Sequence, residues 1–265
     1  MTAMTMEKMV VFHNLLDENA RPAMERWFRR SHVPDVLTQY PWTNRYLLYR
    51  PVPAPEGARD EGLYTYRIHE NWAYDINNRR GGKGLIGMTP EPVANAIKAD
   101  VIHIPAEPTE DFLGADWSYE EHPILRWVIA YRYPAGVSVE ECDRFFLEVQ
   151  AKEIMQMPGL IRFFSHKAID FEGSALPITT DDNKDEEGDK LANLMRHWNR
   201  LSELWFECND DWTNALITNP PAFTKPDWAT SDKFPFLKPG DDFVHTFLLE
   251  SPDNDFTKTF SPLYY

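Results

Sequence analysis

The stretch VVFHNLL at residues 10–16 decides the fold, because a stretch of the same character, WVIAYRY, occurs at residues 127–133. Both are rich in β-branched and aromatic residues, a composition typical of short strands. At the same offset of 117 residues, two longer segments also match: YPWTNRYLLYR (40–50) and MPGLIRFFSHK (157–167). We infer that one structural element occurs twice in the chain.

Two further matches extend the repeat along both copies. The segment YTYRIHENWAY (64–74) matches LWFECNDDWTN (204–214), which aligns Trp72 with Trp212 at the start of a helix in each copy. The segment DVIHIPAEPTEDF (100–112) matches DFVHTFLLESPDNDF (242–256), which aligns His103 with His245. Each copy therefore predicts the order strand, helix, strand, strand, helix, strand.

This order defines an α+β protein made of two ferredoxin-like (β-α-β-β-α-β) repeats. Each repeat forms an antiparallel sheet with both helices on one face, and the bare faces of two such sheets pack against each other. The prediction is an intrachain α+β barrel. The first repeat, 1–113, is the expected active half, and the second, 114–265, carries an insertion and a tail.

Three segments lie outside the repeated elements. Residues 105–123 are rich in proline and acidic residues and are expected to connect the halves, and the acidic residues 170–190 are expected to form a mobile insertion. The tail beyond Asn219 is Pro-rich and ends in FTKTFSPLYY, whose aromatic residues predict packing on the neighbouring half or on a second subunit.

Composition restricts the class of protein. Apolar residues make up 43% of the chain, enough for a substantial core, and the net charge of −15 argues against a nucleic-acid or anionic membrane surface. Only Cys142 and Cys208 are present, too few for a disulfide framework. No apolar run has the length of a signal peptide core or a membrane helix. We expect a cytoplasmic protein that acts on a small molecule, with a homodimer left open.

His32 is the leading candidate for a catalytic side chain. At 100° per residue, Met24, Phe28, His32 and Val36 share the core face of the first predicted helix. The ungapped alignment places Val149 at the position of His32, so the histidine is not required for folding there. Pro34 is expected to break the helix beside the ring. The alternative is a buried histidine that hydrogen-bonds a carbonyl.

The segment FRRSHVPDVLTQYPWTNRYLLYR (28–50) resembles the signature of EthD-type proteins of the dimeric α+β barrel superfamily, with His-x-Pro on the first helix followed by an arginine-aromatic strand. The resemblance implies that His32 takes the position of the family histidine. The second half lacks His-x-Pro, which implies one active site per chain. Relatives in the superfamily include cofactor-free isomerases, cyclases and monooxygenases, as well as haem-handling and stress-response proteins.

Other side chains are candidates for the same site. His13 shares a strand face with Val11 and is expected to line the cavity of His32 or to face solvent. His69 is interpreted as a second proton carrier or as a cap for the helix near Trp72. Tyr49 is a candidate phenol donor, and Arg45 is a candidate anchor for a substrate carboxylate or a scaffold residue matched by Arg162.

Phe28 and Trp72 are expected to line the pocket with aromatic surface, and Arg80, in NRRGGKG (78–84), is expected either to grip an anion at its mouth or to lie in an ordinary solvated loop. This cluster is not a phosphate-binding P-loop, because no Ser or Thr follows its lysine. No metal motif, serine-hydrolase elbow or dinucleotide fingerprint is present, so no metal and no cofactor is predicted.

The sequence therefore predicts cofactor-independent acid–base chemistry by histidine on an aromatic-derived or polyketide-like carboxylic acid. Isomerisation, elimination and ester or lactone cleavage all fit, because neutral imidazole moves protons near pH 7. A cofactor-free monooxygenase and a non-catalytic binding or stress-response protein, with haem binding as a variant, are the alternatives.

Overall fold

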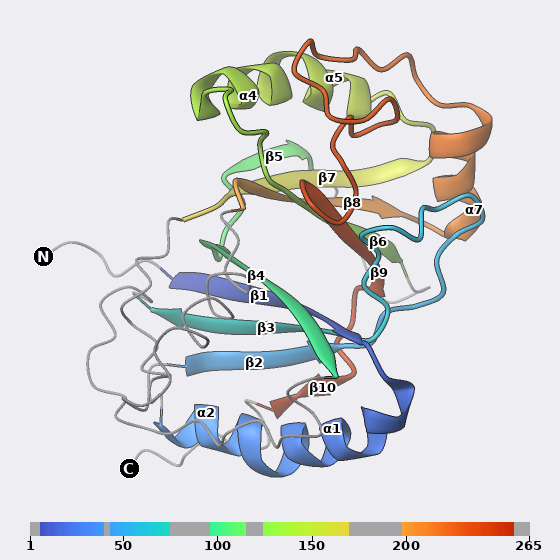
Figure 1. Cartoon of the computed structure of the whole chain (residues 1–265). Helices are drawn as coiled ribbons and strands as arrows, with labels where there is room; N and C mark the ends of the chain where they lie inside the picture. The colour runs from blue at the N-terminus through green and yellow to red at the C-terminus, as the bar shows by residue number, and fades with distance from the viewer. Residues whose placement is uncertain (1–5, 40–42, 75–95, 115–123, 170–197, 257–265) are drawn as a thin grey trace, which may run out of the picture.

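Two five-stranded antiparallel sheets pack face to face in the computed structural model, with helices on the outer side of each (Figure 1). The structure describes residues 6–39, 43–74, 96–114, 124–169 and 198–256. The predicted α+β class and the two ferredoxin-like strand orders are confirmed.

The first sheet has the order β10-β2-β3-β1-β4. Its strands are β1 (Met6–Leu15), β2 (Thr43–Tyr49), β3 (Arg67–Tyr74), β4 (Ile97–Pro105) and β10 (Asn254–Asp255). Its outer face is covered by one helical segment, made of η1 (Glu18–Ala20), α1 (Arg21–Trp27), η2 (Phe28–His32) and α2 (Val33–Gln39).

The second sheet has the order β5-β7-β8-β6-β9. Its strands are β5 (Glu110–Leu113), β6 (Leu125–Tyr131), β7 (Leu160–Lys167), β8 (Arg200–Phe206) and β9 (Phe243–Leu249). Its helices are α4 (Val139–Phe145), η4 (Phe146–Gln150), α5 (Ala151–Ile154), α7 (Asn209–Thr213) and η5 (Asn214–Thr218).

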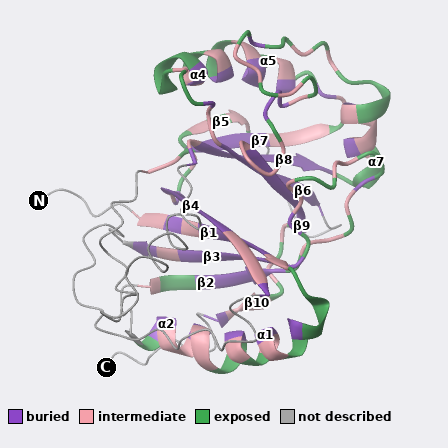
Figure 2. Cartoon of the chain, in the orientation of Figure 1, coloured by how far each residue is buried: buried purple, intermediate pink, exposed green. Residues whose placement is uncertain are grey.

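The central apolar layer lies between the sheets, where buried residues of both halves meet (Figure 2). Period-2 alternation on each strand sends one set of side chains into this layer and the other set toward the helices. Val10 and Phe12 of β1 thus contact the layer that also holds Val128 and Ala130 of β6. The two faces of each sheet are separate chemical environments.

Each sheet ends in a strand from the other half of the chain. Glu110 of β5 pairs with Ser165 of β7, and Asn254 of β10 pairs with Leu48 of β2. Residues 105–123, predicted to connect the halves, thus contain the strand β5. The packing of the tail on the neighbouring half is seen for β10. The domain division at residues 113 and 114 stays a prediction, and residues 170–190 lie outside the described ranges.

The repeat is real, but its register differs from the ungapped alignment. Lys8 and Arg126 pair with Trp72 and Trp205 respectively, so β1 and β6 correspond one residue further along than predicted. Trp72 therefore corresponds to Trp205 and not to Trp212, and it lies within a strand instead of opening a helix.

Candidate functional site

Three histidines lie together between the first sheet and its helix, and we call them the histidine cluster: His13 on β1, His69 on β3 and His32 in η2. Ring centroids are 5.0 Å apart for His13 and His69 and 6.3 Å apart for His32 and His69. The structure therefore brings together all three histidines selected from the sequence. Their chemical roles remain predictions.

Aromatic side chains enclose the histidine cluster. The Phe28 ring lies 5.0 Å from His32 and 5.6 Å from His69, and the Tyr46 ring lies 5.2 Å from His69. The Trp27 ring lies 4.7 Å from the His32 ring at an interplanar angle of 34°. Phe28, predicted to line the pocket, thus contacts the cluster, and Tyr46 joins it from β2.

Burial makes the three imidazoles neutral at physiological pH, because it disfavours their protonated forms. It lowers the pKa of His32 to about 4. It lowers the pKa of His13 to about 3, with further contributions from the charges of His32 and Arg67, and it lowers that of His69 for the same reasons together with the charge of His13. Each ring therefore keeps one nitrogen unprotonated at neutral pH.

Arg67 on β3 places a buried positive charge beside the histidine cluster. Its side chain is 2% exposed, and Nη2 donates to Oε1 of Glu25 at 2.5 Å. Burial raises the pKa of Glu25, but the Arg67 charge and hydrogen bonds from Tyr66, Arg67 and Arg29 outweigh it, so the net pKa is lowered. The pair is ionised at neutral pH.

Several polar atoms at this site have no hydrogen-bond partner among the described residues. They are Nδ1 of each histidine in the cluster and Nε and Nη1 of Arg67, all inaccessible to solvent. A buried polar group without a partner costs about 1–3 kcal/mol. Unsatisfied groups concentrated in one place indicate a site built for a polar ligand.

The second half provides an internal comparison. Arg200 on β8 corresponds to Arg67, because Tyr131 and His13 pair with them in the same way. All three Arg200 nitrogens donate: Nε to Tyr133 at 3.3 Å, Nη1 to Glu110 at 2.5 Å and Ser165 at 3.1 Å, and Nη2 to Asp143 at 3.0 Å. The scaffold alone can therefore satisfy a buried arginine at this position.

The difference between Arg67 and Arg200 in hydrogen bonding arises partly from the edge strand that each sheet takes from the other half of the chain. Glu110 of β5 pairs with Ser165, and its counterpart Asn254 of β10 pairs with Leu48. The first half thus has an amide where the second has a carboxylate, and Asn254 Oδ1 is also buried without a partner among the described residues. Arg67 keeps two N–H groups for another acceptor.

The helix continues through Pro34, contrary to the predicted break. The backbone N–H of Val33 bonds the carbonyl of Phe28, five residues back, and Val33 keeps helical angles of −63° and −48°. The second half has the same π-helical turn at Phe146–Gln150, with no proline after it. The turn is therefore a property of the scaffold, and π-helical turns recur at functional sites.

This correspondence corrects the residue opposite His32. Gln150 ends its π-helical turn as His32 does, so the equivalent is Gln150 and not Val149. His69 likewise lies in the middle of β3, opposite Val11, and does not cap a helix. Its counterpart is Ser202 and not Asn209, because Leu48 and Ser165 pair with the two residues.

Three other predicted residues lie on the opposite face of the first sheet. Tyr49 faces the second sheet, where the Arg126 guanidinium lies 5.0 Å from its ring. Arg45 is exposed and lies 5.2 Å over Trp72. Because successive side chains of a strand point to opposite faces, Tyr49, Arg45 and Trp72 lie on the other side of the sheet from the histidine cluster. Arg80 lies outside the described residues, as does the whole NRRGGKG segment.

Sequence reasoning missed Arg67, Glu25 and the placement of Tyr46 against His69. A correct alignment of β3 with β8 would have shown arginine repeated at Arg67 and Arg200. Tyr46 could be placed only by knowing which residues of β2 face the helix, because Tyr46 and Tyr49 lie on opposite faces of the sheet.

His103 and His245 are structural, but they are not equivalent to each other. His103 Nε2 lies 3.0 Å from Oε2 of Glu7, and His245 Nδ1 accepts from Trp127 Nε1 at 3.1 Å. Met9 and Ile129, their respective partners, occupy different positions in the repeat. Each of these two rings thus has at least one hydrogen-bond partner.

Within the described ranges, no group of three or more His, Cys, Asp or Glu side chains is arranged to hold a metal ion. In the same parts of the chain, no helix combines the length and apolar character needed to cross a membrane.

The fold and the site define a tandem ferredoxin-like α+β barrel with a buried histidine–arginine site. Residues 4–105 match the sequence family described as the chalcone isomerase N-terminal domain. This span contains the histidine cluster and Arg67. The match does not specifically support the EthD-type resemblance, which stays a prediction.

The likeness to one solved structure supports the fold over both halves. A structure described as an anthrone oxidase-like protein is 9% identical, with 96% of this chain and 93% of that chain covered and a TM-score of 0.51. Chlorite dismutase from Candidatus Nitrospira defluvii in complex with imidazole is 9% identical, with 93% and 92% covered and a TM-score of 0.40. No curated protein matches the sequence.

Proposed function

We propose that the protein is a cofactor-independent enzyme that removes and returns a proton on an aromatic-derived or polyketide-like organic acid. The observation that carries the proposal is the buried histidine cluster beside an arginine with two unsatisfied N–H groups. The match of this half to a family named for an isomerase supports an enzyme of this general kind.

Arg67 anchors the substrate in this proposal. A guanidinium donates charge-assisted hydrogen bonds to a carboxylate or an enolate oxygen, and Nε and Nη1, on separate edges of the group, each offer an N–H for a single contact of this kind. Glu25 accepts a hydrogen bond from Nη2 and so fixes the orientation of the guanidinium group. The Phe28 ring lies 5.8 Å from the guanidinium carbon, so it covers one face of the group.

His32 is the proposed general base, and His69 or His13 carries the proton onward. A general base must be unprotonated before it acts, and burial keeps His32 in that form. Removal of a proton α to a carbonyl creates an enolate and an imidazolium together. Arg67 stabilises the enolate, and the enolate stabilises the imidazolium through their opposite charges.

Tyr46 is suited to donate a hydrogen bond to the same oxygen. Burial raises its pKa well above the ordinary value, although the Arg67 charge opposes the shift, so the phenol stays protonated. The proposed reactions are isomerisation, elimination, and ester or lactone cleavage. Isomerisation and elimination need only proton transfer and oxyanion stabilisation. Ester or lactone cleavage also needs a water molecule, which attacks the carbonyl carbon as the histidine takes its proton and then returns that proton to the leaving alkoxide.

The test is turnover of a panel of lactones, ring-cleavage acids and polyphenolic ketones by the wild type and by His32→Gln, the residue at the equivalent position of the second half. We expect turnover to fall by at least a hundredfold in His32→Gln, with an unchanged melting temperature. His103→Gln is the matched control, because it alters a buried histidine outside the cluster, and it keeps full turnover.

Full activity of His32→Gln would overturn the assignment of the base. Turnover that requires dissolved oxygen and consumes it would instead favour the monooxygenase alternative. Ligand binding without product formation across the panel would favour a binding protein.

A further inference from the structure

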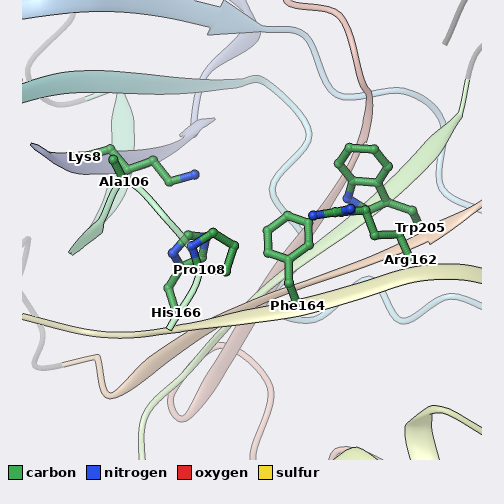
Figure 3. Close-up of a pocket in the computed structure, with 7 residues that line it drawn as sticks. All are labelled: Lys8, Ala106, Pro108, Arg162, Phe164, His166 and Trp205. Atoms are coloured by element: carbon green, nitrogen blue, oxygen red, sulfur yellow. The ribbon is translucent and has the colours of Figure 1, made fainter. Parts of the chain in front are cut away.

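A second polar site lies between the two sheets, on the face opposite the histidine cluster. A cavity of about 200 Å³ opens there, and Figure 3 shows the residues that line it: Lys8, Ala106, Pro108, Arg162, Phe164, His166 and Trp205. A water molecule occupies ~30 Å³ in the liquid, so this volume accommodates one six-membered ring with a small substituent. Both halves of the chain contribute to the lining.

Two cationic groups face each other across this cavity. Figure 3 shows the Lys8 ammonium group and the Arg162 guanidinium group reaching toward one another from opposite sides. Lys8 is 5% exposed, and no carboxylate of the described residues lies within 4.0 Å of it. Arg162 donates to the exposed Asp111 at 3.2 Å. The Lys8 charge acts on the buried Glu203 carboxylate from beyond ion-pair distance, and its ammonium group lies 5.1 Å from the Trp72 ring. A buried lysine without a close counter-charge favours the binding of an anion.

His166 supplies a polar group that the fold leaves unsatisfied. Its side chain is fully buried, and neither ring nitrogen has a hydrogen-bond partner among the described residues. Burial lowers its pKa to about 3, helped by the Lys8 charge, while the Glu203 charge and the backbone of Glu107 and Pro105 oppose the shift. The neutral ring therefore has one N–H to donate.

At the position that the repeat makes equivalent to this cavity, the side chains contact one another. Arg126 corresponds to Lys8, and Tyr49 corresponds to His166, since their strand partners are equivalent. Arg126 Nη2 lies 2.9 Å from Glu203 and 3.7 Å from Glu70, and its guanidinium covers Tyr49. Arg126 thus pairs with both central glutamates, and Lys8 has neither of them within ion-pair distance.

We propose that this cavity is a ligand site, distinct from the histidine cluster, that binds a small aromatic carboxylate. The carboxylate lies between Lys8 and Arg162 and accepts the His166 N–H. The ring packs against Phe164 and Trp205, which the Arg162 guanidinium already covers at 5.0 and 5.6 Å. The site does not depend on the proposed reaction.

Titration calorimetry of the full-length protein with benzoate tests the proposal. We expect benzoate to bind the wild type, its neutral analogue benzamide to bind at least tenfold more weakly, and Lys8→Met to lose at least tenfold in benzoate affinity. The exposed Lys152→Met is the matched control and binds as the wild type does.

A second variant guards against a folding defect in Lys8→Met. The double variant Lys8→Arg/His166→Tyr introduces the residue types found at the equivalent positions, Arg126 and Tyr49. It is expected to fold normally and to bind no benzoate. Wild-type affinity in this variant, or in a folded Lys8→Met, would overturn the proposal. Absence of benzoate binding by the wild type would overturn it equally.

Discussion

Arg67 and Arg200 occupy equivalent positions in the two sheets, yet only Arg200 has every side-chain nitrogen paired within the described residues. The two are 2% and 1% exposed, and each guanidinium lies over the equivalent phenylalanine, Phe28 or Phe146. The same scaffold thus holds a satisfied structural arginine in one half and an arginine with spare donors in the other.

Replacing Asn254 by glutamate should convert the first site toward the second. In Asn254→Glu the new carboxylate, placed as Glu110 is, pairs with Arg67 and competes with an acidic substrate. We expect the KM for such a substrate to rise at least tenfold, with an equal or higher melting temperature. Asn254→Gln serves as the uncharged control in the same kinetic assay, and a KM of Asn254→Glu equal to the control value would contradict the pairing.

The pH dependence of kcat/KM should report the depressed pKa of the base. This parameter follows the ionisation of the free enzyme, and His32 must be neutral to accept a proton. With its pKa lowered to about 4, we expect kcat/KM to stay constant from pH 7 to pH 5 and to fall below about pH 4. An acidic limb near the ordinary histidine value of about 6.5 would assign the base to an exposed histidine instead.

Folding stability should fall as the pH drops below about 6.5. The unfolded chain binds protons at its histidines there, whereas His13 and His32 stay neutral until about pH 3 and about pH 4. Each such histidine lowers the unfolding free energy by ~1.4 kcal/mol per pH unit between its unfolded and folded pKa. Urea unfolding at pH 6.5 and pH 5 measures the effect.

His32→Gln is the control for that measurement. Removing one titrating histidine should reduce the loss between pH 6.5 and pH 5 by ~2 kcal/mol. An equal loss in both proteins would show that His32 is exposed to protons in the folded state.

Breaking the buried ion pair between the sheets should be costly. Arg126 lies against Glu203 with both side chains almost fully buried, and its removal leaves that carboxylate without its main counter-charge. We expect Arg126→Met to destabilise the protein by ~3–5 kcal/mol. Arg132→Met, which alters a more exposed pair with Asp242, should cost far less in the same urea unfolding experiment.

The sequence was sufficient for the fold class but not for the register. The strand order followed from repeated β-branched and aromatic stretches, which survive a shift of one residue. The same shift changes the residue equivalent to His32 from Val149 to Gln150, and these two side chains point about 100° apart on a helix. Gln150 is 7% exposed and His32 is partly buried, so the position is polar in both halves, and the valine comparison used to select His32 no longer applies.

The candidate site was predicted in part for a related reason. The histidines were identifiable as single titratable residues in apolar surroundings, and the structure brings all three together. Arg67 was not identifiable, because a strand arginine usually faces solvent and its burial depends on pairing with Glu25 across the helix. Tyr49 was selected in place of Tyr46 because only the observed strand pairing shows which of the two faces the helix.

The exchange of β5 and β10 also determines how the halves are held together. A single cut in the peptide between β5 and β6 leaves β5 hydrogen-bonded in the second sheet and β10 hydrogen-bonded in the first. Each fragment then contributes one edge strand to the sheet of the other. A nicked chain should therefore behave in solution as an intact heterodimer until it is denatured.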